Sequence, residues 1–146
     1  MCIRDSNKGH DGFLGNSVIG EWCNLGADTN NSNLKNNYGE VRLWHMASST
    51  NQPTGLQFCG LFMGDHCKAG INTMFNTGTV AGVCANIFGS GFPPKYIPSF
   101  SWGGQMGSAK YEIEKALETA KAMYSRRGIQ FSLADENLLR YLYRTF

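Results

Sequence analysis

Charged residues are scarce in this sequence, and long apolar runs are missing. Charged side chains make up 16% of the 146 residues, and the net charge is +2. That balance gives no reason to expect nucleic acid or a membrane surface as a partner. No segment is apolar for long enough to cross a bilayer, and no signal-peptide pattern opens the chain. These absences favour a soluble protein of the cytoplasm.

Paired cysteines are missing as well. The count is odd, and no Cys-x-x-Cys pair occurs, which argues against both a disulfide framework and a structural zinc site. We therefore interpret the thiols as reduced and used as small buried hydrophobes. The five residues are Cys2, Cys23, Cys59, Cys67 and Cys84.

Glycine, in contrast, is abundant, and its 18 occurrences follow a repeat. Larger apolar residues recur every six positions, with a small residue four places later and glycine or asparagine one place later. The clearest run is Met63, Ala69, Phe75, Ala81 and Ile87. A helix needs a period near 3.6 and a simple strand a period of two, so neither explains this spacing. The period predicts an all-β solenoid, a left-handed parallel β-helix of hexapeptide repeats.

The repeat also suggests a domain organisation. We interpret residues 1–6, "MCIRDS", as a non-native leader, because they fit no hexad and look like translated adapter sequence; the natural protein is then longer. Residues 7–104 are expected to form the β-helix, with an inserted loop at about 31–57. Residues 105–146 are expected to form a helical C-terminal appendage. Its first helix would run from Ser108 toward Gly128, and its second would begin at Ser132 with Asp135 completing a capping box.

One stretch carries a family resemblance. The order "KGHDGFLGNSVIGEWCNLGADT", from Lys8 to Thr29, resembles a stretch in the bifunctional glucosamine-1-phosphate acetyltransferase / N-acetylglucosamine-1-phosphate uridylyltransferase family. There, "K-x-G-H-x-x-Y-L-G-D" leads into "I-G-x-x-x-N-I-G-A-G-T". The later "FMGDHCKAGINT" resembles that family's "IIGDDVFVGSDT". The likeness covers Lys8 to Ser90 and looks closest to the sugar nucleotidyltransferase/acyltransferase branch.

The resemblance implies a function and a site. It implies transfer of an acetyl group from acetyl-CoA to an amino-sugar phosphate, glucosamine 1-phosphate, in nucleotide-sugar synthesis. It also implies a homotrimer with clefts between subunits and an upstream nucleotidyltransferase domain. His10 would be the catalytic base, Asn24 a contact to the amino sugar, Ala27 a backbone contact to acetyl-CoA, and Asn33 a neighbour of the acetyl group. Histidine suits a base that works near neutral pH.

The sequence departs from the family in three respects. Phe13 replaces the family's tyrosine, so a hydroxyl is missing, and "NLKN" replaces "N-Y-D-G" from Asn33 onward. The basic residues that hold the sugar phosphate have no counterpart that can be aligned, which leaves Lys8, Lys35 and Arg42 as candidates. The departures leave an alternative open: a non-catalytic domain that trimerises and regulates a sugar-phosphate nucleotidyltransferase.

A metal site is not expected. Some left-handed β-helix proteins are zinc carbonic anhydrases that bind the metal through histidines, but His10, His45 and His66 lack the close pair those enzymes use. We expect His45 and His66 to be structural or surface residues.

Overall fold

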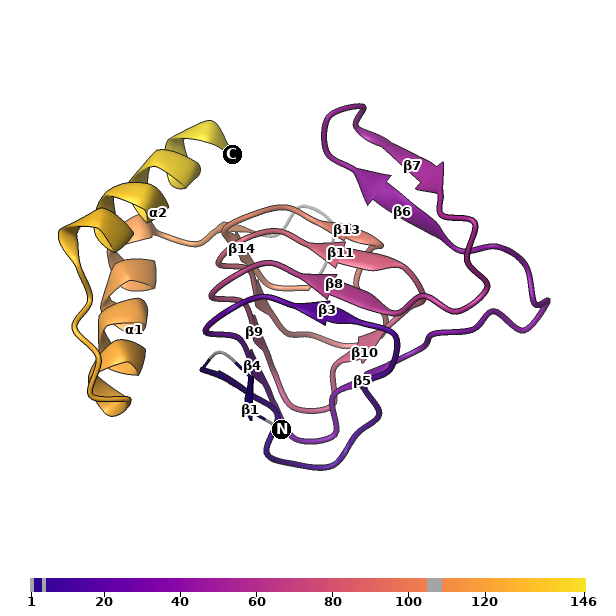
Figure 1. The fold of residues 1–146 in the computed structure, drawn as a ribbon, viewed down its shortest axis with the longest axis horizontal. Helices are drawn as coiled ribbons and strands as arrows, with labels where there is room; N and C mark the ends of the chain where they lie inside the picture. The colour runs from indigo at the N-terminus through magenta and orange to yellow at the C-terminus, as the bar shows by residue number, and fades with distance from the viewer. Residues whose placement is uncertain (1, 4, 105–108) are drawn as a thin grey trace.

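Short strands lie side by side, joined by turns and loops, in the computed structural model, which describes residues 2–3, 5–104 and 109–146 (Figure 1). The largest sheet has seven strands in the order β1-β2-β4-β9-β12-β14-β15. Its inner pairs are parallel, whereas β1–β2 and β14–β15 are antiparallel. The strands are β1 Cys2–Ile3, β2 Ser6–Asn7, β4 Asn24–Leu25, β9 Lys68–Ala69, β12 Asn86–Ile87, β14 Ser101–Trp102 and β15 Ala109–Lys110.

Three smaller sheets accompany it. A parallel four-stranded sheet has the order β13-β11-β8-β3, β10 pairs with β5 in parallel, and β6 and β7 form an antiparallel hairpin. The strands are β3 Val18–Ile19, β5 Asn30–Asn31, β6 Arg42–His45, β7 Thr50–Pro53, β8 Leu61–Met63, β10 Met74–Phe75, β11 Thr79–Ala81 and β13 Tyr96–Ile97.

The predicted fold class, an all-β left-handed parallel β-helix, is wrong. Among the described residues no sheet is closed or forms a solenoid: the strands are short and scattered, and parallel and antiparallel pairs are mixed. The physical reason is that a six-residue period specifies which side chains point inward, while the pairing and direction of strands depend on contacts distant in the sequence. The antiparallel pairs at both ends of the large sheet and the β6–β7 hairpin left no periodic signal.

The core contains the residues that the period marked. Met63, Ala69, Phe75, Ala81 and Ile87 are all buried in one apolar cluster, so the prediction that they point inward is confirmed. Two residues from the small positions, Cys67 and Ala85, are fully buried in the same cluster. Close packing of this kind is the main source of stability for such short strands.

A row of chain corners lies just before strands of the large sheet. Trp22, His66 and Cys84 each precede their strand by two residues and Phe100 precedes its strand by one, and all four have positive φ, between 55° and 62°. Non-glycine residues rarely adopt this conformation, so contacts elsewhere must stabilise it. We call these four residues the corner row.

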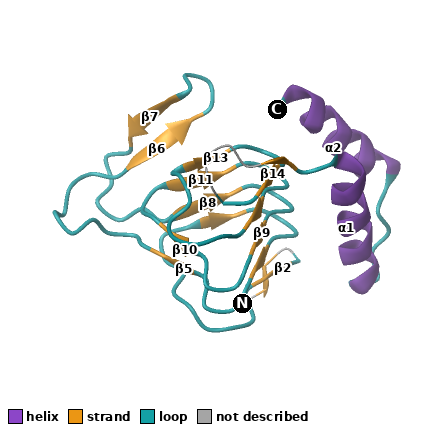
Figure 2. Cartoon of the chain, turned by 180° about the vertical axis from the view of Figure 1, so that it is seen from behind, coloured by secondary structure: helices purple, strands orange, loops and turns teal. Residues whose placement is uncertain are grey.

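Two helices cover the corner row. They are α1 Ile113–Arg126 and α2 Leu133–Thr145, and Figure 2 shows both on one side of the strands, with the β6–β7 hairpin on the other. From α1, Tyr124 stacks on Trp22 with ring centroids 3.8 Å apart, and Leu117 packs in a cluster with Phe100 and Cys84. The predicted helix start at Ser108 lies outside the described residues; α1 itself begins later, after β15.

The capping box predicted at Ser132 is present. Its hydroxyl accepts a hydrogen bond from the Asp135 amide at 3.1 Å, and the Asp135 carboxylate accepts one from the Ser132 amide at 2.9 Å. Replacing Ser132 with Ala is expected to destabilise the protein by about 1 kcal/mol, because the first turn of α2 loses an acceptor. Urea denaturation measures the loss. Ser132→Thr keeps the hydroxyl and serves as the control; equal losses in both variants would contradict the cap's role.

Candidate functional site

His10 lies on a loop, residues 8–17, between β2 and β3. The loop passes very close to the segment before β5: Gly12 has φ +115°, and a Cβ added there would lie 2.2 Å from the carbonyl oxygen of Thr29. The Asp28 amide donates to the Asp11 carbonyl at 3.0 Å across the same contact. Only glycine fits position 12 without strain, so the sequence brings the residue next to His10 into fixed contact with the chain after Ala27.

Two asparagines hold the far end of this loop. The Asn30 side-chain oxygen accepts from the Phe13 amide at 2.7 Å, and that of Asn31 accepts from the Gly15 amide at 2.8 Å. Asn31 also donates to the Gly15 carbonyl at 3.0 Å and is 4% exposed. The backbone amides of the loop therefore donate to side-chain oxygens, where in a sheet they would donate to the carbonyls of a neighbouring strand. Asn31 was expected at the start of an inserted loop, and it lies in β5.

The His10 side chain is exposed and makes no hydrogen bond to any described residue. Its backbone is held instead: the Lys8 ammonium donates to the Asp11 carbonyl at 2.7 Å and lies 3.5 Å from the His10 carbonyl. An imidazole with a fixed backbone and a free ring can meet a ligand and exchange a proton with it.

Ala27 is joined to this loop through its neighbour in the chain. Its neighbour Asp28 is bonded to Asp11, and its own carbonyl accepts from the Asn72 amide at 2.8 Å. The structure thus brings His10 and Ala27 onto neighbouring segments.

The two predicted substrate residues lie apart. Asn24 is in β4 of the large sheet, where its side-chain oxygen accepts a hydrogen bond from the side-chain amide of Asn7 at 3.4 Å. Asn33 follows β5 in a different sheet and donates to the side chain of Asn16 at 2.7 Å. Among the described residues, no hydrogen bond joins Asn24 to Asn33.

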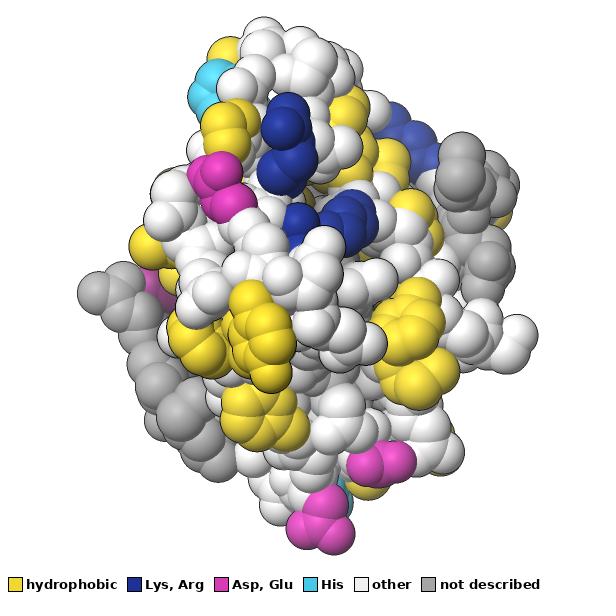
Figure 3. Space-filling model, turned by 90° about the vertical axis from the view of Figure 1, so that its right-hand side faces the viewer, with side chains coloured by type: hydrophobic (Ala, Val, Ile, Leu, Met, Phe, Trp, Pro, Cys, Tyr) yellow, Lys and Arg dark blue, Asp and Glu magenta, His cyan; other side chains and the backbone are white. Residues whose placement is uncertain are grey.

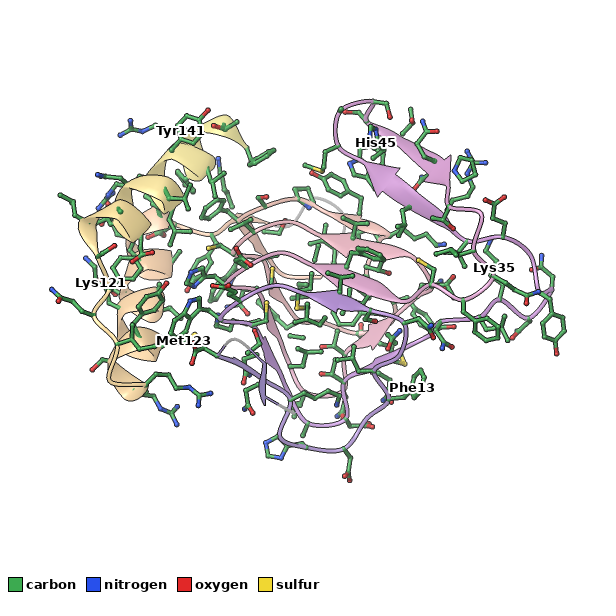
Figure 4. The ribbon with its side chains drawn as sticks, viewed as in Figure 1. Phe13, Lys35, His45, Lys121, Met123 and Tyr141 are labelled. Carbon is green, nitrogen blue, oxygen red and sulfur yellow. The ribbon has the colours of Figure 1, made fainter. Side chains whose placement is uncertain are left out.

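Phe13 lies beside Asn33. A Cβ added at Gly15 would meet the Phe13 ring at 2.4 Å and the Asn33 amide at 3.2 Å, so glycine at this position leaves room for both. The Phe13 side chain is 54% exposed and points away from the strands (Figure 4). The ring covers the loop without offering a hydrogen-bonding group.

A cavity of about 360 Å³ opens next to the His10 loop. The cavity is mostly apolar. Lys8 also lines it, and the Lys8 ammonium lies near the His10 carbonyl. Its apolar walls include Leu14, Val18, Ile19 and Leu25, and its side-chain amides are those of Asn7 and Asn16. A pocket with apolar walls and a few convergent amides suits a small organic ligand.

The other basic candidates lie elsewhere. The Lys35 ammonium donates to the Glu40 carbonyl, on the side of the molecule opposite α1 (Figure 4). Burial, and then the charge of Lys35, lowers the pKa of Lys95. Figure 3 shows Lys and Arg side chains gathered on that face.

The described thiols are poor nucleophiles. Cys23, Cys59, Cys67 and Cys84 are free and buried, in agreement with the sequence interpretation. Burial raises the pKa of the Cys84 thiol to about 12 and raises those of Cys23 and Cys67 as well. Because the thiolate is the reactive form, these thiols are inert at neutral pH.

The remaining histidines are structural or on the surface, as expected. His45 is exposed and its ring nitrogen lies 3.0 Å from the Ser48 hydroxyl, while His66 is in the corner row. Over the described part of the chain, no three His, Cys, Asp or Glu side chains gather as metal ligands would.

Neither described helix has the length and apolar character needed to cross a bilayer. Comparison with models of known protein families finds no match, and comparison with curated proteins also finds none.

Proposed function

We propose that this chain transfers an acetyl group from acetyl-CoA to the amine of an amino-sugar phosphate, glucosamine 1-phosphate, in nucleotide-sugar synthesis. One observation carries the proposal: an exposed imidazole, that of His10, lies on a loop fixed by Gly12, Asn30 and Asn31 beside a cavity of about 360 Å³. The free buried thiols suit the reducing cytoplasm as its compartment.

The reaction needs a base and no protein nucleophile. The amine nitrogen of the sugar forms a bond to the thioester carbonyl carbon, and the carbonyl electrons move to oxygen. His10 takes the proton that the nitrogen loses. When the carbonyl re-forms, the carbon–sulfur bond breaks, and the proton passes from His10 to the leaving thiolate. The products are the acetamide and free CoA, and the imidazole is regenerated.

Three other residues have roles in this proposal. The Ala27 amide donates to a carbonyl group in the amide-containing chain of CoA. The Asn24 side chain binds hydroxyl groups of the sugar. Asn33, held by Asn16, lies at the acetyl end. In the proposed trimer, these residues would lie at the clefts between subunits.

His10→Ala tests the proposal. We expect release of CoA, measured with acetyl-CoA and glucosamine 1-phosphate, to fall by about 10²–10⁴-fold, the range typical for loss of a general base. His45→Ala removes a second exposed histidine far from the loop and should leave the rate unchanged.

The opposite outcome favours the alternative. Phe13 presents no hydroxyl where the resembling family has tyrosine, and this observation favours a non-catalytic domain that assembles and regulates a sugar-phosphate nucleotidyltransferase. If the folded protein releases no CoA above background, the acetyltransferase proposal is wrong.

A further inference from the structure

A second cavity, of about 240 Å³, lies between the strands near the start of the chain and the end of α1. Its walls are mainly polar and come from two elements far apart in sequence. The strands contribute Asn7 and Asn24, and α1 contributes Met123 and Arg126, followed by Arg127. Figure 4 shows Met123 on the side of α1 that faces the strands.

The cavity carries net positive charge. Arg126 and Arg127 supply two guanidinium groups, and the one carboxylate in the lining, that of Asp5, lies 4.0 Å from Nε of Arg127. That distance is at the limit for an ion pair between partly exposed groups, so the attraction between Asp5 and Arg127 is weak. Arg126 is exposed and has no acidic partner among the described residues.

The end of α1 also bears a negative partial charge, which opposes anion binding. Here the last carbonyls are already used: those of Tyr124 and Ser125 accept from the amides of residues 127–129 at 3.0 Å. The two arginines and Asp5 leave a net charge of +1 in the lining, which exceeds a helix-end charge of about half a unit. The balance at this cavity favours an anion.

We propose that this cavity binds the phosphate of a phosphorylated sugar, with Arg126 and Arg127 on the phosphate and Asn7 and Asn24 on the sugar hydroxyls. The inference rests on the proposed function, because it identifies how the acceptor sugar is held. At about 240 Å³ the cavity is below the range of about 300–1,000 Å³ usual for drug-sized ligands, which suits a single sugar ring. Guanidinium groups bind phosphate through paired hydrogen bonds, and side-chain amides bind hydroxyl groups.

The path of the chain connects this cavity to the proposed base. Asn7 lines both cavities, and His10 follows it by three residues, so their Cα atoms are at most roughly 10 Å apart. A sugar with its phosphate against α1 therefore extends toward the His10 loop. Lys35 cannot provide this phosphate contact, because it lies on the side opposite α1.

Calorimetric titration of the full chain with glucosamine 1-phosphate, glucosamine and inorganic phosphate tests the site. The sugar phosphate is expected to bind more tightly than glucosamine. Arg126→Gln and Arg127→Gln should each weaken its binding about tenfold or more, since a hydrogen bond to a charged group contributes about that factor. Asp5→Asn should bind it at least as tightly as the original chain. Arg144→Gln, an exposed arginine near the end of α2, is the control and should change nothing.

The outcomes separate the two proposals. If both arginine variants bind glucosamine 1-phosphate as the original chain does, the phosphate site is wrong, even where CoA release still depends on His10. If binding is lost in the arginine variants but no CoA is released by the original chain, the site stands and the acetyltransferase proposal fails. Circular dichroism of each variant confirms that α1 remains folded.

Discussion

Lowering the pH from 7 to 4 is expected to destabilise this protein by on the order of 3 kcal/mol through His66 alone. Burial, and next the charge of Lys68, lowers the pKa of His66 from its ordinary value of 6.5 to about 4, against the smaller opposing charges of Asp65 and Asp135. The unfolded chain therefore binds a proton between these two pH values, whereas the folded chain does not. Each pH unit in that window is worth about 1.4 kcal/mol.

The geometry explains why the ring stays neutral. Its plane is within 11° of Trp22 and within 9° of Tyr124, at centroid distances of 6.3 Å and 6.1 Å, and Nδ1 is buried without a hydrogen-bond partner. The nearest ammonium, Lys68, donates to the His66 carbonyl at 2.8 Å. A proton on the ring would add a second, uncompensated charge under α1.

Urea denaturation at a series of pH values measures this effect. In the original chain the free energy of unfolding should fall as the pH drops through 6.5, and the part that His66 contributes should level off below about 4. His66→Phe keeps a flat ring, and His66→Asn suits the positive φ at this position; both should lose much of that slope. His45→Phe removes an exposed histidine and should keep it. An unchanged slope in both His66 variants would contradict the assignment.

Replacing Gly12 with Ala is the second change with a large expected effect. The φ of +115° costs a non-glycine residue roughly 1–2 kcal/mol, and the new Cβ would lie 2.2 Å from the Thr29 carbonyl. The loop can relieve the clash by separating from β5. Global stability then falls little, but the bonds from the Phe13 and Gly15 amides to Asn30 and Asn31 are lost.

Hydrogen exchange detects this local opening. The amides of Phe13, Gly15 and Asp28 should exchange about tenfold faster or more, since each 1.4 kcal/mol corresponds to a factor of ten. Acetyl transfer, if His10 is the base, should fall about 10²-fold, because a displaced catalytic group loses its alignment. Gly55→Ala is the control: Gly55 also has positive φ, +72°, but nothing lies within 4 Å of the added Cβ. Equal exchange rates in the Gly12 variant and the original chain would refute the tight contact.

The buried positions could be predicted from the sequence, but the sheets could not. Phe75 and Ile87 were marked by a local pattern, and a local pattern is sufficient to indicate burial. Strand pairing joins distant segments: Leu25 pairs with Ala69, and Trp102 pairs antiparallel with Ala109. This last pair also explains why the first helix begins after residue 110. The cap at Ser132, in contrast, uses residues three apart and was predictable.

The candidate site shows the same limit. His10 was recognised because its neighbours in sequence form a motif. Asn30 and Asn31 were missed because a pair of asparagines looks like a loop, while their bonds reach back 17 and 16 residues to Phe13 and Gly15. Asn24 and Asn33 show the same limit, since Asn24 lies in the large sheet and Asn33 follows β5, which belongs to another sheet.

The corner row limits which substitutions this protein can accept. Glycine would relieve the backbone at Trp22 or Phe100, yet it would leave a hole beneath α1, where both side chains are buried. The same holds from the other side, because a smaller residue at Tyr124 would uncover Trp22. These positions are therefore free to change only together, in pairs that preserve the filled volume between helix and strands.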